Sequence, residues 1–131
     1  MARGPVFVNS SKQKLVSKSS TEAELIGISD VLSHVLWARD FLIEQGHSVG
    51  GAKLYQDNTS TILVANKGLS TSGKTRHNGV RYFFIKYRVD AGEVVLEHVS
   101  TTDMIADILT KPLQGNQFRV LREQLLNWKH E

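Results

Sequence analysis

The segment spanning residues 17–47 constrains the fold most, because it carries the longest helical pattern in the chain. Its apolar side chains recur every three or four residues, at Leu25, Ile28, Leu32, Val35, Leu36 and Leu42. This spacing predicts a long helix with one buried face. Thr21 and Glu24 have the spacing of a capping box at its start, and Gly46 provides a stop. The apolar face of such a helix needs a second layer of structure to cover it.

The rest of the chain alternates between strand-like and helical segments. The strand-like segments are residues 5–8 with 14–16, expected as a hairpin or bent strand, then 53–57 and 93–99. The further helical segments are 58–68, 80–92, 104–110 and 114–131. This order predicts a single α/β domain over residues 1–131, in which helices flank a sheet with at least one parallel pair of strands. Residues 1–3 are either native or added by cloning, and residues 69–78 are expected to form a polar loop.

Composition excludes several classes of protein. The 131 residues contain no cysteine, so disulfides, thiolate metal sites and a cysteine nucleophile are excluded. No apolar run approaches the roughly 20 residues that a membrane helix requires, and residues at the N-terminus lack the basic and apolar pattern of a signal peptide, so no membrane partner is expected. The net charge of +3 and the pI near 9.3 suit a polyanionic partner without requiring one.

Three acidic residues stand out once these segments are placed. Glu24 falls in the first turn of the long helix, Asp57 ends a strand-like segment, and Asp107 lies within the short helix 104–110. Strand ends and neighbouring helix starts meet at one edge of an α/β sheet, where ligands usually bind. Carboxylates gathered there would repel one another unless a cation compensates, and Mg²⁺ or Mn²⁺ suits their hard oxygen atoms.

Each of these acids also has a purely structural explanation. Glu24 completes its capping box, Asp57 caps the helix that starts at Asn58, and Asp107 is a surface acid on a short amphipathic helix. Asp107 is flanked by apolar residues and has no capping role, which favours the metal site for the set as a whole. The residues alone leave both interpretations open.

Four stretches of the sequence resemble the ribonuclease H domain that follows reverse transcriptase in the polyprotein of copia-type retrotransposons. They are KQKLVSKSSTEAEL (12–25), LYQDNTSTILVANKG (54–68), KTRHNGVRYFFIKYRVDAGEVVLEHVSTTDMIADILTKPL (74–113) and the tail ending in LLNW. The resemblance implies a ribonuclease H-like fold, a mixed sheet flanked by helices. It also implies an active site in which two Mg²⁺ or Mn²⁺ ions, held by carboxylates, serve to cut the RNA strand of an RNA·DNA hybrid.

Site residues follow from matching these motifs one by one. The resemblance implies that Glu24 of TEAEL, Asp57 of YQDN and Asp107 of ADILTK are the catalytic and metal-binding acids. It further implies that a basic segment contacts the backbone of the hybrid, reading its shape rather than its base sequence. The residues of that segment are Lys74, Arg76, His77 and Arg81.

The sequence departs from the family pattern at its N-terminal side. A complete domain of the family opens with a strand that carries one more catalytic aspartate, whereas residues 5–16 match the last strand before the long helix. The chain is therefore expected to be N-terminally truncated, lacking the first strands and the first acid. Two functions follow as alternatives: a ribonuclease H that is weak or inactive by itself, or an inactive nucleic-acid-binding or oligomerising remnant. The open sheet edge is expected to be filled in one of three ways: by strand exchange in a homodimer, by rearrangement of residues 5–8 into the gap, or by an upstream polyprotein segment. An intracellular location, in a cytoplasmic particle or the nucleus, is expected.

Overall fold

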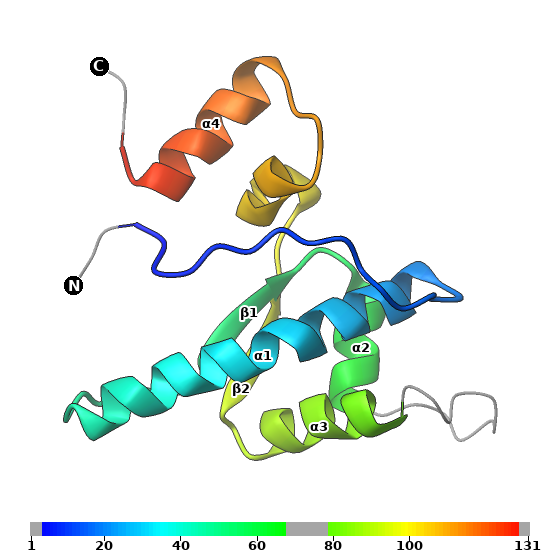
Figure 1. Ribbon diagram of the computed structural model, residues 1–131, viewed down its shortest axis with the longest axis vertical. Coiled ribbons are helices and arrows are strands. Elements are labelled where there is room, and N and C mark those ends of the chain that lie inside the picture. The colour runs from blue at the N-terminus through cyan, green and yellow to red at the C-terminus, as the bar shows by residue number, and fades with distance from the viewer. Residues whose placement is uncertain (1–3, 68–78, 129–131) are drawn as a thin grey trace. The chain divides into compact units, whose positions relative to one another are not determined.

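The computed structural model describes residues 4–67 and 79–128 (Figure 1). The chain divides into two compact units. Unit 1 combines Met1–Lys14 with Val99–Glu131, and unit 2 spans Leu15–His98. No helix among the described residues is both long and apolar enough to cross a membrane.

Unit 2 is built on two parallel strands. In their register, Ala52 lies opposite Val94 and Gln56 lies opposite His98. Parallel strands need a long crossover connection, which two helices supply here. The elements in chain order are α1 (Ser20–Glu44), β1 (Ala52–Gln56), α2 (Thr59–Lys67), α3 (Gly79–Asp90) and β2 (Val94–His98). The α/β class and the parallel pair are thus confirmed, and the arrangement is compatible with a ribonuclease H-like fold.

The core of unit 2 lies on one face of this sheet. Strand alternation places Leu54 and Gln56 of β1 on the same face as Val94 and Leu96 of β2. The buried core cluster consists of Ile28, Leu32 and Leu36 from α1, Ala65 from α2, Ile85 from α3, and Val94 and Leu96 from β2. Because all three helices contribute to a cluster that includes β2, they cover the same face of the sheet.

The start of α1 differs from the sequence prediction. Ser19 is the N-cap, and its hydroxyl accepts a hydrogen bond from the backbone N–H of Glu22 at 3.1 Å. The carboxylate of Glu22 in turn accepts a hydrogen bond from the backbone N–H of Lys18 at 2.6 Å. The predicted box of Thr21 and Glu24 is therefore wrong, because Ser19 satisfies the first helical N–H groups two residues earlier. The helix itself is confirmed, and it ends before Gly46, whose φ of 84° closes it.

Helix α3 is confirmed, but of its predicted buried face only Phe84 packs against the core. The expected face was Val80, Phe83, Phe84 and Tyr87, of which Val80, Phe83 and Tyr87 are 80%, 68% and 66% exposed. Instead Tyr82 and Ile85 are buried. Both sets of apolar side chains have helical spacing, and the packing of α3 against α1 and α2 selects the second set.

Unit 1 contains the short 3₁₀ helices η1 and η2 and the helix α4. The bounds are Thr101–Asp103 for η1, Ile105–Leu109 for η2 and Gly115–Leu126 for α4. The helix expected over residues 104–110 is thus a 3₁₀ helix, whose tighter winding is usual in pieces this short. The terminal helix is confirmed, with Leu121 fully buried, and Asn127 ends it in the left-handed conformation.

The predicted strand over residues 5–8 and 14–16 is wrong. Neither segment forms a strand, and Val6 and Val16 are 91% and 94% exposed. A strand exists only where a neighbouring strand accepts its backbone hydrogen bonds, and the described residues of unit 1 contain no strand. Between these two segments, the hydroxyl of Ser10 donates a hydrogen bond to the carbonyl oxygen of Leu109 at 3.0 Å.

Thr61 of α2 allows the cost of a buried hydroxyl group in the core to be measured. Its side chain is completely buried, and its hydroxyl has no hydrogen-bond partner among the described residues. A buried hydroxyl without a partner costs free energy, so Thr61→Val is expected to raise the free energy of unfolding by about 1 kcal/mol. Denaturant titration would measure the change, with the exposed Thr59→Val as the matched control. A lower stability for Thr61→Val would show that the hydroxyl is bonded.

Lys53 and Glu97 form an ion pair of 2.8 Å across the exposed face of the sheet. The hydrogen bond to Glu97, and then its charge, raise the pKa of Lys53 above the ordinary value of 10.5. A raised lysine pKa contributes stability that is fully present below that value and is lost as the pH rises through the raised pKa. A double-mutant cycle with Lys53→Met and Glu97→Gln is expected to give a small coupling energy near neutral pH and none well above 10.5. An unchanged coupling at high pH would contradict this assignment.

Candidate functional site

Asp57 follows directly after the last residue of β1, at the turn into α2. The cap of α2 is the next residue, Asn58, whose side-chain oxygen accepts the N–H groups of Ser60 at 3.0 Å and Thr61 at 3.2 Å. Asp57 is therefore not needed as the helix cap, which was its structural alternative. Asp57 is half-buried at the end of a strand, a rigid position for a ligand-binding side chain.

Glu24 lies near the start of α1 and is linked to the end of β1. The side-chain N–H of Gln56 donates to Oε2 of Glu24 at 3.1 Å. The start of α1 is capped by Ser19, and Glu22 rather than Glu24 reaches back, to the N–H of Lys18. The bond from Gln56 brings the carboxylate of Glu24 to the residue that immediately precedes Asp57.

The chemistry of these two acids fits a hard divalent cation. Mg²⁺ is commonly held by one or two carboxylates, with water and substrate phosphate completing its coordination. Within neither unit do three or more His, Asp or Glu side chains of the described residues gather as a preformed metal site. Glu24 and Asp57 carry the oxygen ligands that such an ion prefers, and their binding of Mg²⁺ or Mn²⁺ stays a prediction.

Asp107 belongs to unit 1, in the middle of η2. It is only 7% exposed, and its carboxylate pairs with the ammonium group of Lys111, one turn later, at 2.6 Å. The backbone carbonyl of Asp107 also accepts the N–H of Lys111 at 2.8 Å. A buried carboxylate requires such compensation, so Asp107 is not a free surface acid. Its convergence with Glu24 and Asp57 stays a prediction.

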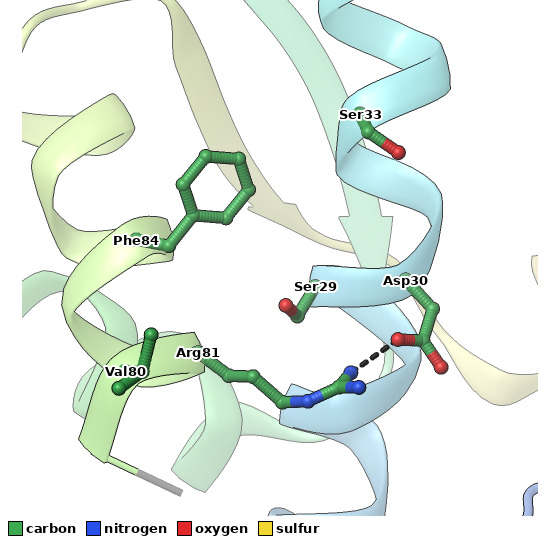
Figure 2. A pocket seen from close by; sticks show the side chains of 6 residues that line it. All are labelled: Ser29, Asp30, Ser33, Val80, Arg81 and Phe84. Carbon is green, nitrogen blue, oxygen red and sulfur yellow. Dashed lines mark hydrogen bonds and ion pairs between the residues drawn. The ribbon is translucent and has the colours of Figure 1, made fainter.

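Of the predicted nucleic-acid contacts, only Arg81 lies among the described residues; Lys74, Arg76 and His77 lie outside them. The guanidinium of Arg81, on α3, pairs with the carboxylate of Asp30 on α1 (Figure 2). This ion pair lies in an open pocket of about 410 Å³ between the two helices. Its other lining residues are Ser29, Ser33, Val80 and Phe84. A phosphate contact by Arg81 stays a prediction, and it would have to share the guanidinium with Asp30.

The sequence interpretation did not single out Gln56, whose side chain bonds both Glu24 and the turn at Asp57. The signal was available in the strand pattern: Gln56 occupies the same face of β1 as Leu54, the face that packs on the core. A polar side chain at such a position must find hydrogen-bond partners, and those partners lie at the junction that carries Asp57.

Nearly the whole chain is similar in sequence to parts of known proteins. No family model and no solved structure matches it. Over 117 residues, 88% of the chain, it is 37% identical to the retrovirus-related Pol polyprotein from transposon RE1 of Arabidopsis thaliana. Over 120 residues it is 32% identical to that from transposon TNT 1-94 of Nicotiana tabacum, and over 122 residues 28% identical to the truncated transposon Ty1-A Gag-Pol polyprotein of Saccharomyces cerevisiae. The chain spans only 8% to 10% of the length of these relatives. It is homologous to a short segment of retrotransposon Pol polyproteins.

Proposed function

We propose that this chain is the ribonuclease H part of a retrotransposon Pol polyprotein and that, only weakly by itself, it hydrolyses the RNA strand of RNA·DNA hybrids. The observation that carries the proposal is the hydrogen bond from Gln56 to Glu24, because it brings an acid of α1 to the strand end that bears Asp57. The ribonuclease H motifs that contain these acids, TEAEL and YQDN, support it. The homology to Pol polyproteins over 88% of the chain supports it as well.

In this function Glu24, Asp57 and Asp107 would together hold two Mg²⁺ or Mn²⁺ ions. The bound ions would supply an activated water and neutralise charge during phosphodiester hydrolysis. Glu24 and Asp57 are mounted on a helix and at a strand end, so their carboxylates are presented in a defined geometry with little ordering on binding. The phosphates of the hybrid would be contacted by Lys74, Arg76, His77 and Arg81. Such contacts bind the substrate without reading its base sequence.

A cleavage assay tests this function directly. The full chain is incubated with a hybrid labelled on the RNA strand, in Mn²⁺ and in Mg²⁺, beside matched duplex DNA and duplex RNA. The expected result is cleavage of the RNA strand of the hybrid alone, abolished by a chelator of divalent ions. Cleavage that persists in the chelator would overturn the two-metal mechanism. Hybrid binding with no cleavage under any condition would favour the inactive nucleic-acid-binding module instead.

A further inference from the structure

Gln56 is a buried polar residue at the boundary between a strand and the candidate site. It is the last residue of β1, and its side chain is only 6% exposed. Strand alternation places it on the core-facing side, where an apolar residue would be the ordinary choice. A buried amide is retained there only if its hydrogen bonds are satisfied.

The hydrogen bonds of Gln56 run in two directions. Its side-chain nitrogen donates to Oε2 of Glu24 at 3.1 Å. Its side-chain oxygen accepts the backbone N–H of Asp57 at 2.9 Å and that of Asn58 at 3.2 Å. The orientation of the amide follows from chemistry, since a carboxylate can only accept and backbone N–H groups can only donate.

One side chain thus connects an acid on α1 to the backbone of the turn that presents the other acid. Glu24 and Gln56 are 32 positions apart in the chain, so no local structure would hold them together. Without the amide, the carboxylate of Glu24 would be free to rotate away, and the turn at Asp57 would lose the acceptor for its N–H groups. Partners of this kind orient metal ligands without touching the metal. Removing one lowers metal affinity by about 10-fold to 100-fold.

We infer that Gln56 is a positioning residue, which sets the carboxylate of Glu24 and the turn at Asp57 in the geometry that binds a divalent ion. This inference rests on the proposed function, because it assumes that the two acids are metal ligands. The simpler alternative is that Gln56 only stabilises the fold by satisfying buried polar groups. The two roles differ in one measurable quantity, the metal affinity of the protein that remains folded.

The inference is tested by measuring Mn²⁺ binding to the full chain with titration calorimetry. The temperature is one at which circular dichroism shows each variant to be folded. Gln56→Met keeps the length of the side chain and removes all its hydrogen bonds, and Gln56→Asn keeps an amide too short to bridge both partners. Each is expected to weaken Mn²⁺ binding by about 10-fold to 100-fold. Gly51→Ala, at the opposite end of β1, is the matched control, since it disturbs the same strand without touching these hydrogen bonds.

Each outcome decides between the roles. Weaker binding in the Gln56 variants with unchanged affinity in Gly51→Ala supports the positioning role. Unchanged affinity in the Gln56 variants, or an equal loss in Gly51→Ala, overturns it while leaving the proposed function intact. If the unaltered chain shows no saturable Mn²⁺ binding, the metal site and the role of Gln56 both fail. Gln56→Asn decides the result if Gln56→Met does not fold.

Discussion

Replacing Asp57 with asparagine is expected to reduce divalent-ion-dependent cleavage of an RNA·DNA hybrid by at least about 100-fold. Asparagine has nearly the shape of aspartate but no negative charge, so the substitution removes a cation ligand with little change in packing. The cap of α2 is unaffected, because Asn58 supplies it. The measurement is the initial rate of RNA-strand cleavage in Mn²⁺, together with the thermal midpoint of each protein.

The matched control for this prediction is Asp40→Asn. Asp40 lies on α1, its side chain is 63% exposed, and it pairs with the neighbouring Arg39. The same change of charge at this site is expected to leave the cleavage rate unaltered. Equal cleavage by the unaltered chain and by Asp57→Asn would mean that a contaminating nuclease produces the activity.

Replacing Gly51 with alanine is expected to lower the free energy of unfolding by roughly 1–3 kcal/mol. A Cβ atom at Gly51 would lie 2.6 Å from the carbonyl oxygen of Gly92 and 3.3 Å from Cγ2 of Val95. The closer of these atoms belongs to the backbone and cannot rotate away, so the starts of β1 and β2 would have to separate. That separation strains the first bond between them, in which the N–H of Ala52 donates to the carbonyl of Glu93 at 2.8 Å.

Gly27→Ala is the control that isolates this steric effect. Gly27 lies within α1, and a Cβ atom there would meet nothing within 4 Å. Because alanine favours a helix over glycine, this substitution is expected to raise the free energy of unfolding by about 0.5–1 kcal/mol. Denaturant titration of both variants gives the comparison. A destabilisation of Gly51→Ala no larger than a few tenths of a kcal/mol would show that the strand starts can relax.

Local patterns predicted the elements of unit 2 well. The apolar periodicity of residues 17–47 yields α1, and the alternation of short strand-like and helical segments yields the parallel pair of β1 and β2. These features depend on backbone geometry over a few residues, which side-chain spacing reports directly. The motifs TEAEL and YQDN predict Glu24 and Asp57 as acids of the site, and this stays a prediction.

Features that depend on distant partners were predicted poorly. Helix α3 carries apolar side chains on more than one face, so its sequence could not say that Ile85 would be buried and Phe83 exposed. Residues 5–8 have the composition of a strand and yet form none, because strand formation depends on a neighbour that composition does not reveal. The N-cap is Ser19 instead of Thr21, because several polar residues in a row could serve as caps.

The sequence by itself determined the fold class and the long helix, and it predicted the acids of the candidate site. Only the tertiary structure decided which faces are buried and how Glu24 is tied to the end of β1 through Gln56. The physical reason is the distance along the chain over which each effect acts. Helix and strand propensity depend on neighbouring residues, whereas burial and side-chain hydrogen bonds depend on residues that only the folded chain brings together.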